Sequence, residues 1–247
     1  MKMLIYVVVL IFLLVLMSTF CKKEVDNFIK DIDGNVYTYI TIGTQVWMKE
    51  NLKTTKYNDG TAIPNKTDNT AWAALATGAY SDYSNNPGDS TMYGRLYNWF
   101  AVDNNAGTKV ASNGGKNVCP TGWHLPSDAE WKTLTDYLTN KGYGFQGSGN
   151  DIAKSMASTS GWTTYGTLGT VGNDQASNNS SGFTALPSGC RNYNGTFCDF
   201  GSYAYWWSST EGSSTDAYYR LMFYVSSIVS RIDYLKRYGF SVRCLRD

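Results

Sequence analysis

The chain has 247 residues, of which 43% are apolar, 15% aromatic and only 17% charged. The apolar share is ordinary for a folded globule, whereas the charged share lies below the roughly 25% that is typical of soluble domains. The formal net charge is +1, and it falls to zero without the first 20 residues, where Lys2 is the one charged residue. A neutral chain gives no electrostatic basis for binding a phosphate backbone, so we expect no nucleic acid partner.

The N-terminus has the features of an export signal. Lys2 precedes an unbroken apolar run from Met3 to Met17, which suits the core of a signal peptide and is too short to span a bilayer. Cys21 follows shortly after this run, a placement that resembles the lipobox of bacterial lipoproteins, in which the cysteine is acylated. Phe20 departs from that motif, because the residue before the cysteine is usually small, but relaxed lipoboxes of this kind resemble those of Bacteroidetes.

The organisation that follows is a lipoprotein signal peptide over residues 1–20, a lipidated Cys21, a tether over residues 21–30 and one domain over residues 31–247. We expect the protein to be held at the outer membrane by its lipid alone and to face the cell exterior. An ordinary secretory signal and an uncleaved anchor helix are the alternatives.

The first part of the domain has the pattern of short strands and loops. Alternating apolar residues predict a strand over residues 36–42 and a second strand that begins at Val46. Residues 61–92 are rich in polar and turn-forming types and are expected to form a loop with a short helix at residues 70–75. Over residues 93–102 the apolar residues recur at helical spacing, which predicts a helix.

Residues 119–131, CPTGWHLPSDAEW, carry the strongest local signal. Ser127 is followed three residues later by Glu130, the pattern of a capping box at a helix start. The helix would bury one apolar stripe, formed by Trp131, Leu134 and Leu138. Gly142 is expected to end it near residue 141. A second short helix is predicted over residues 151–157.

The C-terminal part has the pattern of successive strands separated by turns. We predict strands over residues 183–186, 188–193, 196–199, 204–209, 217–224, 227–234 and 239–245. Five of the aromatic residues in this part are candidate binding residues: Tyr193, Tyr205, Trp206, Trp207 and Tyr218. Because alternate residues of a strand face opposite sides, we expect about half of such side chains to be exposed. The basic residues of this part are interpreted as solvated strand faces; they are Arg231, Lys236, Arg237, Arg243 and Arg246.

Four cysteines remain if Cys21 is lipidated, and an even number in an exported chain favours two disulfides. Cys190 and Cys198 lie on either side of Asn194–Gly195, a hairpin turn signal that would place the two sulfurs across from each other. Cys119 and Cys244 would then form a long-range bond. Zinc is the competing interpretation, but the chain has one histidine and no Cys-x-x-Cys pair, so we expect no metal centre.

Several segments together resemble the Fibrobacter succinogenes major paralogous domain of bacterial lipoproteins. They are IGTQVWMKENLKT (42–54), YGRLYNWFAV (93–102), CPTGWHLPSDAEW (119–131), GFTALPSGCRNYNGTF (182–197), YWWSST (205–210) and GFSVRCLRD (239–247). HLPSDAEW is also distantly similar to a segment of the formylglycine-generating sulfatase-modifying family. This second resemblance implies an α+β, C-type-lectin-like fold, with two main helices packed on twisted antiparallel strands and many long loops.

The resemblances imply a surface-binding or adhesion role rather than catalysis, with a glycan or a protein as the ligand. A structural component of the outer envelope is one alternative. The other is an oxidoreductase related to the formylglycine generators, which use two cysteines with copper, but the surroundings of Cys190 and Cys198 do not match that family's active-site motif.

The remaining chemistry favours structural roles. His124 is the only histidine, and we expect it to hydrogen-bond across the helix start rather than to act in catalysis. No cofactor is expected. Structural calcium is conceivable at the Asp- and Asn-rich segments 103–105 and 173–179, although turn formation explains these residues better.

Overall fold

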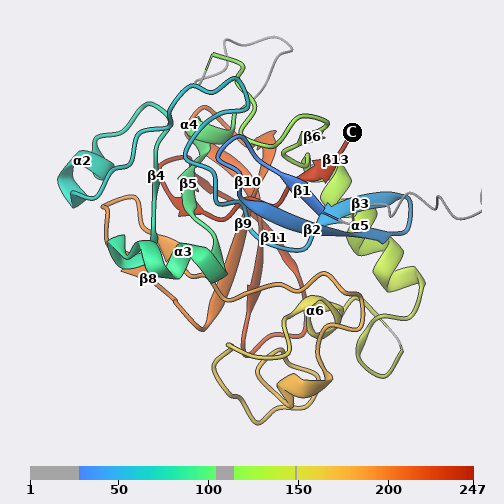
Figure 1. Cartoon of the computed structure of the whole chain (residues 1–247). Coiled ribbons are helices and arrows are strands. Elements are labelled where there is room, and N and C mark those ends of the chain that lie inside the picture. Colours follow the sequence, from blue (N-terminus) through green and yellow to red (C-terminus); the bar gives the residue numbers. More distant parts are fainter. Residues whose placement is uncertain (1–27, 104–113, 148) are drawn as a thin grey trace, which may run out of the picture.

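The computed structural model describes residues 28–103, 114–147 and 149–247. The predicted signal peptide, Cys21 and most of the predicted tether lie outside these residues. The described chain is built mainly from antiparallel strands, which form three sheets (Figure 1). One long helix and several short helices complete the fold.

The first sheet has five strands and joins the beginning of the domain to its last residues. Its order is β1-β2-β3-β13-β6. The strands are β1 (Phe28–Lys30), β2 (Val36–Ile42), β3 (Gln45–Met48), β13 (Leu245–Arg246) and β6 (Trp123–His124). Leu245 pairs with Trp47 on one side and with His124 on the other, so the C-terminal strand closes this sheet.

The other two sheets contain the remaining strands, most of which come from the C-terminal half of the chain. The three-stranded sheet has the order β11-β10-β9, and the second five-stranded sheet has the order β4-β5-β12-β7-β8. The former consists of β9 (Tyr203–Glu211), β10 (Asp216–Phe223) and β11 (Ser230–Leu235). The latter consists of β4 (Tyr80–Ser81), β5 (Leu96–Asn98), β12 (Gly239–Phe240), β7 (Cys190–Arg191) and β8 (Phe197–Cys198). The predicted strand over residues 183–186 is absent from the described residues, where Ala185 makes only an isolated bridge with Ala157.

The expectation of a C-type-lectin-like α+β fold with two main helices is wrong. Among the described residues, one helix, α5 (Asp128–Asn140), is 13 residues long, and the others have four to seven residues. These are α2 (Asn69–Ala73), α3 (Pro87–Tyr93), α4 (Trp99–Val102) and α6 (Ala153–Met156). The described part of the chain is therefore mainly β, and within it only α5 is long enough to present a complete apolar stripe.

The predicted helix over residues 93–102 breaks for a local reason. Gly94 ends α3 with a φ of 76°, a backbone conformation that favours glycine. A Cβ at this position would lie 2.6 Å from Cβ of Asn51, so the chain needs glycine to pass there. The next residues form β5, which pairs with β4 and β12, before the chain returns to a helix at α4. Strand pairing thus overrides the helical spacing of the apolar residues.

Two apolar cores lie on opposite faces of the three-stranded sheet. One contains Tyr205, Trp207 and Tyr219. The other contains Trp206 together with Trp131, Leu134 and Leu138, the predicted stripe of α5. Because both faces of β9 are covered, its alternating side chains are buried on both sides. The expectation that half of the aromatic residues are exposed fails here.

Both predicted disulfides are present. Cys190 and Cys198 face each other across the β7–β8 hairpin, and Cys119 and Cys244 are joined with a Cα–Cα distance of 6.0 Å. The interpretation of the basic C-terminal residues as solvated faces is wrong for Arg243 and Lys236, which are both buried. Arg243 lies between the aromatic rings of the second core, with its guanidinium carbon 4.3 Å from the centroid of Phe183.

Candidate functional site

The five predicted binding residues do not form one site. Tyr205, Trp206 and Trp207 are buried, and their polar atoms have partners inside the protein. Trp206 Nε1 donates to Asn51, and the Tyr205 hydroxyl donates to a carboxylate oxygen of Asp199. Tyr193 and Tyr218 are the two that solvent reaches, and each belongs to a different surface.

Tyr193 belongs to an exposed cluster that we call the tyrosine patch, formed by Tyr193, Ile232, Tyr234 and Tyr238. Tyr193 and Tyr234 are 44% and 45% exposed. The Tyr238 ring lies between them, 5.7 Å from Tyr193 and 4.8 Å from Tyr234. Tyr238 also lies 5.5 Å from the core residue Phe240, so packing fixes the centre of the patch while its outer rings face solvent.

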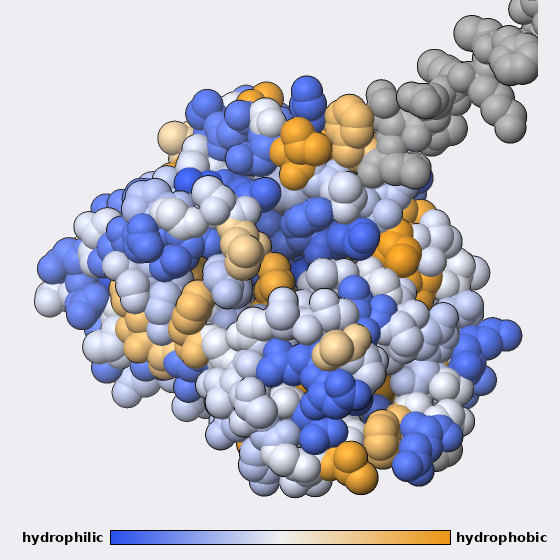
Figure 2. Space-filling model, turned by 60° about the horizontal axis from the view of Figure 1, so that its bottom comes forward, coloured by the Kyte–Doolittle hydropathy of each residue, from blue (hydrophilic) through white to orange (hydrophobic). Residues whose placement is uncertain are grey.

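Burial, followed by a hydrogen bond with Tyr234, raises the pKa of Tyr238 above its ordinary value. The Tyr238 phenol is therefore a neutral hydrogen-bonding group at physiological pH. On the face that Figure 2 shows, strongly apolar side chains form only small separate patches among polar ones. The tyrosine patch combines exposed aromatic rings with hydroxyl groups that can form hydrogen bonds.

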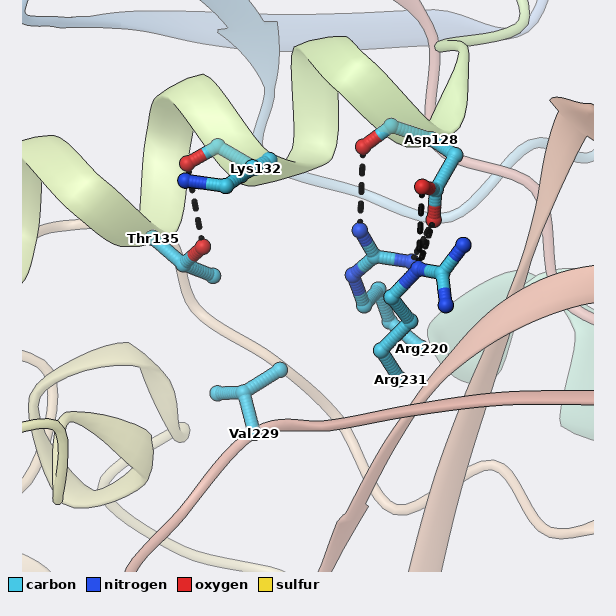
Figure 3. Close-up of a pocket in the computed structure, with 6 residues that line it drawn as sticks. All are labelled: Asp128, Lys132, Thr135, Arg220, Val229 and Arg231. Carbon is cyan, nitrogen blue, oxygen red and sulfur yellow. Dashed lines mark hydrogen bonds and ion pairs between the residues drawn. The ribbon is translucent and has the colours of Figure 1, made fainter.

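Tyr218 lies beside a pocket between α5 and the three-stranded sheet, which we call the α5 pocket (Figure 3). The pocket has a volume of about 370 Å³ and is lined by Asp128, Lys132, Thr135, Arg220, Val229 and Arg231. In Figure 3 the first three residues extend from α5, and the others face them from β10, β11 and the segment between them. The guanidinium carbon of Arg231 lies 3.8 Å from the centroid of the Tyr218 ring.

Asp128 holds both arginines of the pocket. Its carboxylate accepts from Nη1 of Arg220 at 2.7 Å and from Nε of Arg231 at 2.9 Å. Burial of the carboxyl opposes its ionisation, but the hydrogen bonds from the two arginines outweigh burial and lower the pKa of Asp128. Burial lowers the pKa of Arg220, whereas the bond to Asp128 raises that of Arg231. One carboxylate is therefore shared by two guanidinium groups.

The predicted capping box is present at the start of α5 and extends to the chain terminus. Ser127 Oγ accepts from the amide of Glu130, and the Glu130 carboxylate accepts from the amide of Ser127 at 2.7 Å. The other oxygen of Glu130 lies 2.9 Å from Nε2 of His124, and Nδ1 of His124 lies 2.6 Å from Oδ1 of Asp247. His124 thus links the helix cap to the last residue. Both of its ring nitrogens are bonded to carboxylates, and neither is bonded to a hydroxyl group that could act as a nucleophile.

The two carboxylates favour the protonated imidazole. The hydrogen bond with Glu130 is the largest cause of the raised pKa of His124, and the same bond lowers the pKa of Glu130 to about 2. Because the folded-state pKa of His124 is above its ordinary value of 6.5, this contact contributes its full stability below that value and loses it as the pH rises through the folded-state pKa.

We therefore expect the free energy of unfolding to fall by up to about 1 kcal/mol as the pH rises above 6.5, since both carboxylates are reached by solvent. His124→Gln should remove this decline. Urea unfolding between pH 5.5 and 9 measures the effect, and parallel pH profiles for the two proteins would contradict it.

The Asp- and Asn-rich segment 173–179 is organised by an ammonium group. Lys154 is buried, and its Nζ donates to the backbone oxygens of Asn173 and Asp174 and to Oδ1 of Asn178. These oxygens are the type of ligand that calcium prefers, and here they already surround a cation. Of the other segment, 103–105, only Asp103 belongs to the described residues.

One group of potential metal ligands occurs among the described residues, formed by Cys190, Cys198 and Asp199. The two cysteines are joined in a disulfide and are not available as thiolate ligands in this state.

The residues that sequence reasoning missed come from distant parts of the chain. Tyr234 and Tyr238 follow the predicted aromatic cluster, and the alternation of Ile232 and Tyr234 in a predicted strand is the one signal that could have placed them on a common face. Lys132, Arg220 and Arg231 of the α5 pocket carry no motif. Only the packing of α5 against the three-stranded sheet brings them together.

Three comparisons with known proteins place the chain. Among the described residues, no helix combines the length and apolar character needed to cross a membrane. No curated protein and no solved structure gives a significant match, and the distant similarity to the sulfatase-modifying family is not supported. Residues 40–246 match the sequence model of the Fibrobacter succinogenes major domain. The chain therefore belongs to the Fibrobacter succinogenes major domain family.

Proposed function

We propose that the protein is a lipid-anchored module of the outer membrane that binds a glycan at the cell surface and performs no catalysis. The observation that carries this proposal is the tyrosine patch, where two tyrosines more than 40% exposed flank a third that is fixed by the core. Tyrosine rings stack on the apolar faces of sugars, and their hydroxyl groups bond to sugar hydroxyls. Burial of exposed aromatic residues on binding is also the pattern of binding hot spots.

The surroundings of the patch favour binding over turnover. Its rings are held by neighbouring rings and by strand pairing, and none of its four residues carries a carboxylate or a thiol. His124, the single histidine, is engaged with Glu130 and Asp247 in a helix cap. The lipidated Cys21 and the tether would display the domain away from the membrane, which suits recognition of an extended polymer.

Alanine substitution at Tyr193 and Tyr234 tests the proposal. We expect each change to weaken binding to a recognised polysaccharide by about tenfold, because each removes one stacking ring. Glycan arrays identify the ligand, and titration calorimetry measures the change. Tyr165→Ala is the matched control, since Tyr165 is 39% exposed and packs on Tyr224 outside the patch. Equal effects of all three changes, or no glycan bound by the native protein, would refute glycan recognition by this surface.

A structural role in the envelope is the second candidate, and one observation favours it. Strand β11 is the edge of its sheet, and its four central residues, 231–234, are exposed. An exposed edge strand can pair with another chain. Stable partners recovered from membranes, with no sugar binding, would favour assembly over recognition.

A further inference from the structure

The α5 pocket lies on the opposite face of the three-stranded sheet from the tyrosine patch. Tyr218 and Arg220 alternate along β10 with Tyr219, which packs in the core beneath the patch. Ile232 and Tyr234 likewise alternate with Arg231 along β11. The two surfaces therefore share a sheet but no residue, and a ligand of one has no direct contact with the other.

We propose that the α5 pocket binds the carboxylate of an acidic sugar, such as a uronic acid unit of a polysaccharide. This inference goes beyond the proposed function, because it assigns a second site whose ligand is recognised by charge.

The charge of the pocket supports this assignment. Arg220 and Arg231 are directly opposite each other on adjacent antiparallel strands, an arrangement of like charges that destabilises a sheet. Asp128 is the only carboxylate that lines the pocket, so it leaves one guanidinium charge uncompensated. The ion pair of Lys132 with Asp136 at 2.5 Å is exposed and restrains Lys132 weakly. A ligand carboxylate would supply the missing negative charge.

The geometry of the arginines suits a planar anion. The side chain of Arg220 is 3% exposed and is fixed by Asp128 through two bonds, one to the carboxylate and one to the backbone oxygen. Arg231 donates from Nε to Asp128, its side chain is 50% exposed, and its guanidinium group lies against the ring of Tyr218. A guanidinium group can hold a carboxylate through two parallel hydrogen bonds. Arg231 is thus the residue that would contact the ligand.

The rest of the lining suits a sugar ring. The volume of about 370 Å³ is near the lower limit of small-molecule pockets, which favours one ring over a longer chain. Val229 gives an apolar wall across from α5, and Thr135 gives a hydroxyl group (Figure 3). A uronic acid has the corresponding features: a carboxylate, C–H groups on its faces and hydroxyl groups around its edge.

Calorimetric titration of the purified protein with glucuronate, glucose and acetate at equal ionic strength tests the site. We expect saturable binding of glucuronate, with acetate at least about tenfold weaker and no binding of glucose. Arg231→Gln should weaken glucuronate binding about tenfold or more, and Lys132→Gln about threefold. Lys141→Gln is the matched control, because Lys141 is exposed at the C-terminal end of α5 and does not line the pocket. Circular dichroism confirms that each variant is folded.

The proposal is overturned if glucuronate does not bind, or if Arg231→Gln and Lys141→Gln behave alike. It is also overturned if acetate binds as tightly as glucuronate, since the pocket would then recognise any carboxylate. Tyr193→Ala and Tyr234→Ala should leave glucuronate binding unchanged. A failure of the tyrosine patch and a failure of the α5 pocket are therefore separate results.

Discussion

The double variant Cys119→Ala/Cys244→Ala should lose about 5 kcal/mol of unfolding free energy, because the bond closes a loop of 125 residues in sequence separation. Its position adds to the effect. Cys244 directly precedes β13, and Cys119 lies four residues before β6, its partner strand. Each of these strands has only two residues, so their pairing depends on a covalent bond at its edge. Such a loss is a large part of the 5–15 kcal/mol typical of domains.

The second disulfide provides the internal comparison. Cys190→Ala/Cys198→Ala should lose only about 2.5 kcal/mol, since the two cysteines are eight residues apart and the hairpin turn already sets their register. Unfolding by guanidinium chloride measures the two losses, with each variant keeping its remaining disulfide and the native protein as the reference. Equal losses would show that loop length does not determine the contribution of these bonds.

The features that could be predicted from the sequence rest on short stretches of chain. Ser127 and Glu130 are three residues apart, and Gly142 follows the apolar stripe, so the start and the end of α5 could be predicted. The Cys190–Cys198 pairing likewise follows from the turn between them. In each case the signal and the structure that it determines lie within one element, where hydrogen-bonding geometry is local.

The features that could not be predicted depend on what covers each element. Trp206 and Trp207 alternate as a half-exposed strand would, yet both are buried because a core lies on each face of β9. The order of the strands in the sheets could not be predicted either, because a strand of two residues is too short to show an alternation of apolar and polar side chains. The α5 pocket brings Lys132 together with Arg220 and Arg231, which lie 88 and 99 positions further along the chain. From the sequence alone, charged residues at such positions are expected to face solvent, and only the packing shows that they meet.

Arg243 is the clearest example, and we expect Arg243→Met to cost about 3 kcal/mol or more of stability. The buried guanidinium donates to the backbone oxygens of Phe183 and Thr184 and to Oδ1 of Asn51. Loss of the donor leaves the backbone oxygens of Phe183 and Thr184 unsatisfied, at about 1–3 kcal/mol each, whereas Oδ1 of Asn51 keeps the bond from Trp206. The relief of a buried charge offsets this cost only in part. Burial lowers the pKa of Arg243 to about 9, so the group is charged at neutral pH.

Two further variants separate the contribution of the guanidinium hydrogen bonds to stability from the contribution of the positive charge. Arg243→Lys keeps a cation but lacks the planar group that reaches three acceptors and stacks on Phe183, so its loss should equal or exceed that of Arg243→Met. Arg246→Met is the matched control, since Arg246 is exposed and stacks on Tyr39, and it should cost less than about 1 kcal/mol. Urea unfolding at pH 7 gives all three values. If Arg243→Lys were as stable as the native protein, a positive charge alone would account for the contribution of Arg243. The hydrogen bonds of the guanidinium group to residues 51, 183 and 184 would then not be required.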